Sequence, residues 1–167
     1  QVLAQTTKAR KAEADRLVQQ GSQQLRANQL EPALQSFQKA LIIYRKIKNP
    51  KGEGGTLLIL GLVYSRLQDY SQAIDYYKQS LVIAREIKDS ELEALAKQGL
   101  AHVELRSDLK KVEADALFNQ GIQQAQASQF KAALQSWKQA LKIYREIKNR
   151  RVEGYALGNI GVTYNSL

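Results

Sequence analysis

The sequence predicts an all-α protein built of stacked helical hairpins, and three observations lead to that prediction. Residues 10–67 and 110–167 align without a gap at an offset of 100, and about half of the positions are identical. A shorter period of 40 runs inside the first copy. Apolar residues recur with helical spacing almost throughout. Periods of this length are typical of supersecondary units that bury their apolar faces only by stacking on one another.

The helical spacing places eight helices along the chain. They are expected at 8–28, 31–48, 52–67, 70–88, 91–106, 109–127, 130–148 and 151–167. Pro32 falls in the first turn of the second helix, where its missing N–H costs nothing. Asn49 and Pro50 end that helix. Because the intervening loops are short, neighbouring helices should be antiparallel.

Small and aromatic residues at repeated positions predict how each hairpin closes. A glycine stands in the middle of four helices, at a cost of about 1 kcal/mol relative to alanine, which a helix accepts where another segment must come close. In the following helix an alanine precedes an aromatic residue by one turn, and that aromatic ring should plug the hairpin. The glycines are Gly21, Gly61, Gly121 and Gly161, the alanines are Ala33, Ala73 and Ala133, and the aromatic residues are Phe37, Tyr77 and Trp137.

These residues at these spacings resemble the tetratricopeptide repeat (TPR) in its 40-residue form. The clearest stretches are LGLVYSRLQDYSQAIDYYKQSLVIAREIKD and LGNIGVTYNSL, and the resemblance covers nearly the whole chain from about residue 10. It looks most like the arrays of kinesin light chains, and of cyanobacterial proteins in which such repeats precede a caspase-like CHAT peptidase domain. The resemblance implies a right-handed superhelical solenoid that acts as a protein-interaction module.

The repeat pattern is interrupted near residue 107. The helix at 91–106 aligns with the one at 52–67, but the next helix copies the first one instead of supplying an aromatic plug. That copy keeps the polar Gln120 and Gln124 where the helix at 52–67 has Leu60 and Tyr64, which suits a helix with nothing packed before it. The alternative is that the helix at 109–127 stands in for the missing partner, so that the superhelix continues out of phase.

We therefore divide the chain into three parts. Residues 1–7 form a leader or tail, residues 8–106 form a TPR array of two hairpins and a capping helix, and residues 107–167 form a second array. The second array stops after the first helix of its second hairpin, and the parent protein is expected to continue.

Composition and motifs argue against an enzyme. The chain has no cysteine, which excludes disulfides, thiolate metal sites and cysteine nucleophiles. Its single histidine, His102, cannot build a histidine metal cluster. The glycine-rich run at 52–56 follows no predicted strand and lacks the lysine of a phosphate-binding loop. No apolar run approaches the length of a membrane span. We expect no catalytic residues, no metal and no cofactor.

The resemblance implies a concave groove lined by the first helix of each hairpin. Most inward-facing positions are apolar, so the expected ligand is an apolar or amphipathic peptide segment, from a partner protein or from a downstream domain of the same chain. The candidate groove residues are Val18, Leu58, Leu62, Leu95, His102, Phe118, Asn119, Ile122 and Asn159.

The polar groove positions separate two classes of TPR ligand. Val18 and Ser22 stand where the chaperone-binding class has the Lys and Asn that hold a carboxylate, so that clamp is not expected. Asn119 and Asn159 match an inward asparagine with which peptide-binding relatives hold the ligand backbone, because an amide donates and accepts at once. The alternative is that both asparagines are merely solvated.

Basic residues give a second candidate surface on this chain of net charge +9. They gather at helix C-terminal ends and the following turns, at Arg45, Lys46, Lys48, Lys51, Arg145, Lys148, Arg150 and Arg151. Cations there complement the helix dipole, so a solvated edge explains them. If the turns line up, they could instead form a ridge that binds nucleic acid or an anionic surface. No aromatic residue is interleaved for base stacking.

Two expectations concern the ends of the chain. Val2, Leu3 and Ala4 resemble the end of a secretory signal, so the localisation is left open between cytoplasmic and extracytoplasmic. The helix at 151–167 should expose an apolar stripe that invites pairing, which predicts a homo-oligomer through this helix. The stripe consists of Leu157, Ile160 and Tyr164.

Overall fold

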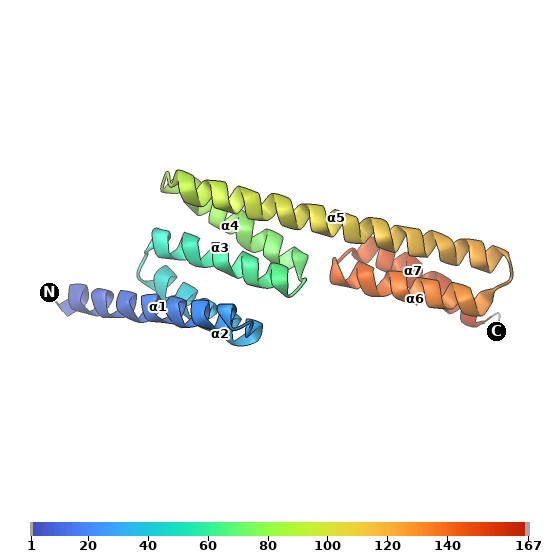
Figure 1. Cartoon of the computed structure of the whole chain (residues 1–167), viewed down its shortest axis with the longest axis horizontal. Coiled ribbons are helices and arrows are strands. Elements are labelled where there is room, and N and C mark those ends of the chain that lie inside the picture. The colour runs from blue at the N-terminus through green and yellow to red at the C-terminus, as the bar shows by residue number, and fades with distance from the viewer. Residues whose placement is uncertain (1, 166–167) are drawn as a thin grey trace. The chain divides into compact units, whose positions relative to one another are not determined.

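The computed structural model describes residues 2–165, and side chains from residue 6 onward. The described residues form seven helices joined by short turns and no strand (Figure 1). The helices are α1 (Val2–Arg26), α2 (Leu30–Lys46), α3 (Pro50–Arg66), α4 (Tyr70–Glu86), α5 (Ser90–Gln126), α6 (Phe130–Glu146) and α7 (Arg150–Tyr164). The predicted all-α fold of helical hairpins is confirmed.

The turns share one geometry at a spacing of 20 residues. Each contains a residue other than glycine with a left-handed backbone, with φ between 53° and 61°. These residues are Asn28, Lys48, Gln68, Lys88, Ser128 and Lys148. The next residue starts the following helix: Asn49 Oδ1 accepts the backbone N–H of Gly52 at 2.9 Å, and Pro50 is the first helical residue of α3.

The structure has one long helix where the sequence predicted two. We expected separate helices at 91–106 and 109–127, but α5 runs from Ser90 to Gln126 without a turn. Asn49, Asp69 and Asp89 each accept a backbone N–H at the start of a helix, whereas Leu109 at the corresponding position has no acceptor to offer. Helices α2, α6 and α7 begin without such a bond, so the missing cap favours continuation but does not by itself explain it.

Two other boundaries also differ from the expectation. Helix α1 begins at Val2 rather than at residue 8, so the predicted leader is helical along its described length. The side chains of Val2, Leu3 and Ala4, which carried the resemblance to a secretory signal, lie outside the described residues. Helix α7 ends at Tyr164, and residues 166–167 of the predicted last helix are not described.

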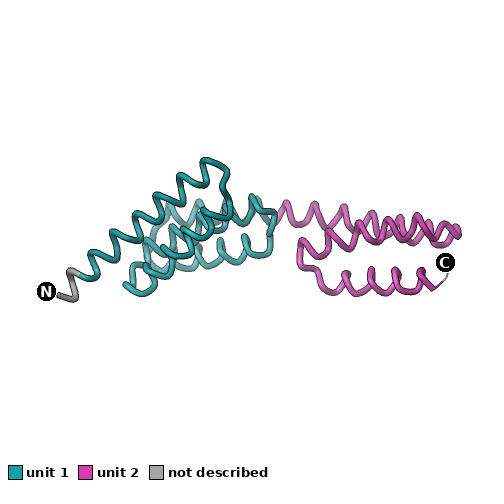
Figure 2. The backbone as a smooth tube through the Cα atoms, turned by 90° about the horizontal axis from the view of Figure 1, so that it is seen from below, with its two compact units in different colours: residues 1–103 teal, residues 104–167 magenta. Residues whose placement is uncertain are grey.

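The chain divides into two compact units, residues 1–103 and 104–167 (Figure 2). Unit 1 contains α1 to α4 and the first part of α5, and unit 2 contains the rest of α5 with α6 and α7. The expected array boundary between residues 106 and 107 falls inside α5, close to this division.

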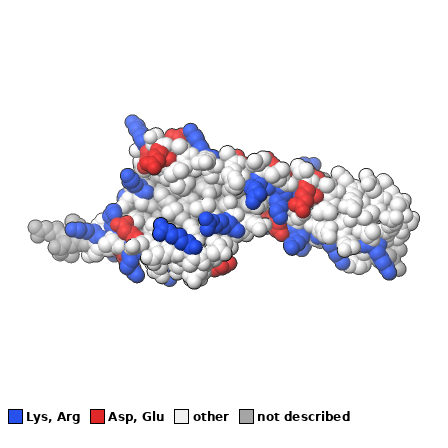
Figure 3. All heavy atoms as spheres, viewed as in Figure 1, with Lys and Arg blue, Asp and Glu red and all other residues white. Residues whose placement is uncertain are grey.

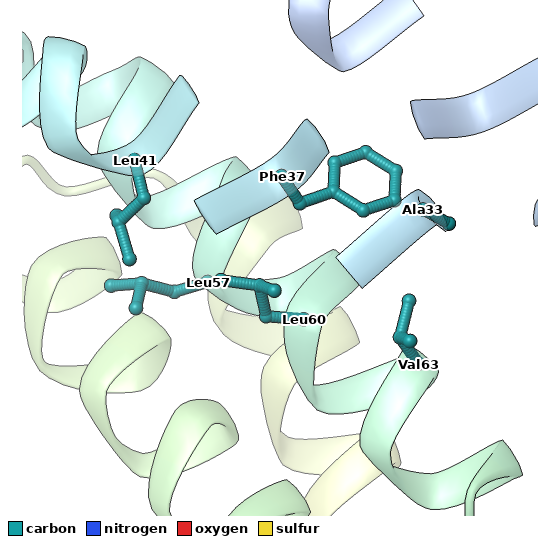
Figure 4. Close-up of a cluster of buried hydrophobic side chains, with 6 residues drawn as sticks. All are labelled: Ala33, Phe37, Leu41, Leu57, Leu60 and Val63. Carbon is teal, nitrogen blue, oxygen red and sulfur yellow. The ribbon is translucent and has the colours of Figure 1, made fainter. Parts of the chain in front are cut away.

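The core of unit 1 forms where α2 packs against α3. Phe37 and Leu41 of α2 meet Leu57, Leu60 and Val63 of α3, and each of these side chains is at most 5% exposed (Figure 4). Burying an aliphatic or aromatic side chain of this size contributes about 1.5–3 kcal/mol. This cluster is therefore a main source of the stability of unit 1.

The predicted aromatic plugs are confirmed in both units. A Cβ atom placed on Gly21 would lie 2.9 Å from the Phe37 ring, and one on Gly61 would lie 2.8 Å from the Tyr77 ring. In unit 2 the Trp137 indole lies against Gly121 in the same way. The glycines are needed because a side chain at these positions would occupy the space of the ring.

Gln124, which was expected to face solvent, and its counterpart Gln24 are held between helices instead. Ser36 Oγ donates to Gln24 Oε1 at 2.7 Å, and Ser136 Oγ donates to Gln124 Oε1 at 2.7 Å. The side chains thus satisfy each other in a partly buried position. Gln120 is exposed, as a helix with nothing packed before it requires.

Candidate peptide-binding surface

One face of α3 is apolar and open to solvent. Gly55, Leu58 and Leu62 follow one another at helical spacing, so they share a face of the helix. Leu58 is half-buried and Leu62 is 40% exposed, whereas Leu57 on the opposite side is fully buried. The surface over the middle of α3 carries few charged atoms (Figure 3). An aliphatic surface is therefore available beside the core.

The part of α5 within unit 1 also exposes an apolar side chain. Leu95 is 45% exposed and His102 is also exposed, while Ala96 and Val103 of the same helix are fully buried. An exposed imidazole without a positioned partner is not arranged for general-base work. His102 therefore offers a hydrogen-bonding group beside an exposed leucine.

Val18 differs from the other candidate groove residues of unit 1. It is half-buried and packs against the core cluster formed by α2 and α3. Its backbone carbonyl accepts the hydroxyl of Ser22 at 2.8 Å. Val18 therefore presents less apolar surface to a ligand than Leu62 does.

The candidate residues of unit 2 divide between core and surface. Phe118 packs against the core, with its ring edge-to-face on Tyr144 at 6.4 Å between centroids, and its carbonyl accepts Trp137 Nε1–H at 3.1 Å. Ile122 and Asn159 are half-buried, and Asn119 is exposed. Asn119 is thus the more accessible of the two asparagines.

Sequence reasoning missed two exposed apolar residues of α7. Tyr155 is 56% exposed and Val162 is 69% exposed. They stand at an offset of 100 from Gly55 and Leu62, so the internal repeat places them on the corresponding face of α7. The internal repeat alone therefore predicts that Tyr155 and Val162 are exposed. The match of Asn159 to an inward asparagine does not include these two positions.

Two arginines of the candidate basic edge are paired with carboxylates. Arg45 Nε lies 2.8 Å from Glu53 Oε1, and Arg145 Nε lies 2.9 Å from Glu153 Oε1. Arg45 also donates to Gln79 at 3.1 Å. The glutamate eight residues after each arginine therefore neutralises part of the positive charge expected along this edge.

The same pair recurs between α4 and α5. Arg85 Nε lies 3.1 Å from Glu93 Oε1, and Lys97 lies 2.8 Å from the same oxygen. Hydrogen bonds from Lys97 and Arg85 hold the pKa of Glu93 below its ordinary value. The repeated Arg–Glu pair is a structural feature of the turns.

The remaining residues of the candidate basic edge are exposed and belong to different units. Unit 1 carries Lys46, Lys48 and Lys51, and unit 2 carries Lys148, Arg150 and Arg151.

Two kinds of site are not found in the part of the chain that the structure describes. No group of three His, Asp or Glu residues there could hold a metal ion. None of the described helices combines the length and the apolar character needed to cross a membrane.

A comparison with protein families gives a match to part of the chain. The model of the tetratricopeptide repeat matches residues 14–86, which cover most of α1 and all of α2, α3 and α4. This match supports a tetratricopeptide repeat (TPR) array in that part of the chain. Tetratricopeptide repeats generally mediate protein–protein interactions.

A solved structure also resembles the chain. It is the crystal structure of a signal transduction ATPase with numerous domains (a STAND protein) with a tetratricopeptide repeat sensor, from Pyrococcus horikoshii. The match has 27% identity and a TM-score of 0.45, and it covers 81% of this chain and 18% of that protein. No curated protein matches the chain. The link to peptidase-associated repeats stays a prediction.

Proposed function

We propose that this protein is a non-catalytic scaffold that binds an apolar or amphipathic peptide segment on the exposed faces of α3 and α5 in unit 1. The observation that carries the proposal is the exposure of Leu62 and Leu95 on helices whose opposite sides are buried in the core. Leucines on such helices are ordinarily covered, and clustered exposed apolar side chains are typical of interaction surfaces.

The proposed ligand follows from the chemistry of this surface. An amphipathic helix can cover Leu58, Leu62 and Leu95 with its apolar side and keep its polar side in water. Burying the exposed part of one leucine side chain contributes on the order of 1 kcal/mol to the free energy of binding. His102 provides a polar contact at the margin, and in unit 2 the exposed Asn119 can pair with a peptide backbone. The segment comes from a partner or from a downstream domain of the same protein.

A peptide-display selection against the whole chain tests the proposal. Peptides enriched from a random library are labelled, and their affinity is measured by fluorescence anisotropy. The variant Leu62→Asp with Leu95→Asp should lower the affinity at least about tenfold, because it places charge in an apolar contact. Since both residues are exposed, the fold should persist, which circular dichroism checks.

A matched control variant distinguishes binding on α3 and α5 from nonspecific binding to other exposed apolar residues. Ile42 of α2 and Val82 of α4 are 53% and 54% exposed and lie on the second helices of their hairpins. The variant Ile42→Asp with Val82→Asp should leave the affinity within about twofold. An equal loss in both variants would contradict the proposal.

Salt dependence distinguishes peptide binding from the nucleic-acid alternative. Binding to an apolar surface should change little with salt, whereas binding to phosphates falls steeply with log[salt]. The paired states of Arg45 and Arg145 weaken the alternative.

We also propose that the chain self-associates through α7. Leu157 and Tyr164 are 44% and 54% exposed, as expected, whereas Ile160 packs partly against the core of unit 2. Tyr155 and Val162 extend the exposed apolar surface. Sedimentation should show a concentration-dependent dimer that Leu157→Asp abolishes, and a monomer at all concentrations would contradict the proposal.

A further inference from the structure

A cavity of about 680 Å³ lies in unit 1 between the N-terminal part of α1 and the turn from α2 to α3. Three of its lining residues are lysines, Lys8 and Lys11 of α1 and Lys48 of the turn. Ile47 and Pro50 give it apolar surface. None of the candidate groove residues lines it, so this cavity is separate from the peptide surface. The cavity is shallow and largely open to solvent.

The charge around this cavity is largely uncompensated. Lys11 pairs with Asp15 at 2.7 Å. Lys8 and Lys48 are exposed, and neither forms an ion pair with a described acidic residue. Arg10 and Lys46, next in sequence to the lining residues, are likewise exposed and unpaired within the described part of the chain. Like charges gathered in this way repel one another.

The corresponding corner of unit 2 carries less positive charge. The five cationic positions of unit 1 are Lys8, Arg10, Lys11, Lys46 and Lys48, and their counterparts are Asp108, Lys110, Lys111, Glu146 and Lys148. The net charge of these five positions is therefore +5 in unit 1 and +1 in unit 2, and Arg150 of unit 2 stands where unit 1 has the lining residue Pro50. Lys110 Nζ and Glu146 Oε2 form an ion pair at 3.4 Å, where unit 1 has Arg10 and Lys46.

The comparison removes the structural explanation for two cations of unit 1, Lys8 and Lys46. The hairpin forms in unit 2 with Asp108 and Glu146, so the fold does not require lysine at these positions. A bound anion would offset the repulsion that unit 2 avoids by pairing.

We propose that the cavity of unit 1 binds a compact multivalent anion. The ammonium groups of Lys8, Lys11 and Lys48 bind the negative groups of the anion. Arg10 and Lys46 increase the positive potential around the cavity. Lysine acts as a flexible point charge and binds phosphate and carboxylate groups alike. Ile47 and Pro50 contact the carbon part of an organic anion. The proposal does not depend on the peptide-binding function.

Isothermal titration calorimetry of the whole chain with tripolyphosphate, at about 150 mM NaCl, tests this site. One equivalent should bind. The variant Lys8→Asp with Lys46→Glu gives unit 1 the charges of unit 2, and it should weaken binding at least about tenfold. The control Lys131→Asp with Lys142→Glu changes the net charge equally at two exposed positions of α6, and it should weaken binding less than about threefold. Equal losses in both variants would overturn the proposal.

A gain-of-function variant tests the same idea without damaging the site. Asp108→Lys with Glu146→Lys gives unit 2 the charges of unit 1, and the stoichiometry should rise from one equivalent to two. Amide chemical shifts should move at residues 7–11 and 47–49 in the unaltered chain. A stoichiometry that stays at one, or shifts confined to other residues, would overturn the proposal.

A second probe distinguishes the two chemical sources of the anion. Citrate carries carboxylates in place of phosphates. Similar affinity for both probes supports a site that recognises charge alone, and a preference of tenfold or more for one probe supports a site for that class. Absence of binding heat with both probes at millimolar concentration would overturn the proposal.

Discussion

Helix α3 of unit 1 and helix α7 of unit 2 are copies at an offset of 100, and their apolar residues differ in exposure. Leu57 is fully buried and its counterpart Leu157 is 44% exposed. The Tyr77 ring lies against Gly61, whereas nothing lies within 4 Å of a Cβ on Gly161. The difference comes from α4 and α5, which cover α3 within unit 1. The burial of a repeat residue is therefore set by the neighbouring helix rather than by its own sequence.

Truncating the aromatic plug should have the largest effect on stability. Trp137 is 4% exposed and donates a hydrogen bond to the Phe118 carbonyl. Trp137→Ala should lower the free energy of unfolding of unit 2 by about 3–5 kcal/mol. Amide hydrogen exchange, read separately for the two units, measures this. The matched variant Phe37→Ala should act on unit 1, and a loss of protection spread equally over both units would contradict the two-unit description.

Leucine truncations test the comparison of α3 with α7 directly. Leu57→Ala should cost about 2–5 kcal/mol, because it leaves a cavity in the core. Leu157→Ala should cost less than about 1 kcal/mol, because its side chain is partly in water already. Chemical denaturation followed by circular dichroism compares the two. Equal costs would show that α7 is covered in solution.

Alanine at the two matching glycines should change stability in opposite directions. Gly61→Ala should destabilise by about 1–3 kcal/mol, because the new Cβ would lie 2.8 Å from the Tyr77 ring. Gly161→Ala should stabilise by about 0.5–1 kcal/mol, because alanine is the better helix former and the space is open. Thermal unfolding midpoints give the sign, and destabilisation by Gly161→Ala would indicate a segment packed over it.

A hydrogen bond shared by both units should give a small effect on stability that depends on pH. Tyr44 Oη donates to Asp15 Oδ1 at 2.6 Å, and Tyr144 donates to Asp115 at 2.7 Å. Hydrogen bonds from Lys11 and Tyr44 hold the pKa of Asp15 below its ordinary value. Burial, and then the Asp15 carboxylate, raise the pKa of Tyr44. Tyr44→Phe should cost about 1 kcal/mol at neutral pH.

The sign of the pH dependence follows from the two shifts. The lowered Asp15 pKa contributes stability above about pH 4 that is lost as the pH falls through the folded value. The raised Tyr44 pKa contributes stability below about pH 10 that is lost as the pH rises further. Denaturation midpoints across this range should therefore vary less in Tyr44→Phe. An unchanged profile would show that the hydrogen bond is absent in solution.

The features that the sequence predicted well are those repeated many times. Helical spacing and the glycine–aromatic pairs recur in register, so the hairpins and plugs could be read from them. The continuity of α5 was not predicted, because the missing turn occurs once, whereas the turns at the other positions repeat every 20 residues.

The candidate site was predicted less completely, because its residues stand at the border between buried and exposed helix faces. The helical period does not separate Val18 and Phe118, which pack against the core, from the exposed Leu62. The Arg–Glu pairs were also missed, although an acidic residue eight positions after Arg45 and Arg145 repeats in the sequence. Only the packing of successive helices brings such residues together.

The single helix α5 takes part in both cores while its middle turns contribute to neither. Leu105, Leu109 and Val112 are 59%, 56% and 65% exposed there. Backbone hydrogen bonds and the ion pairs of Lys110 and Lys111 hold this stretch, and helix with so little apolar side-chain packing opens at a low free-energy cost. Amide exchange should thus be fastest in the centre of the longest helix of the described chain, at a point where opening leaves each core intact.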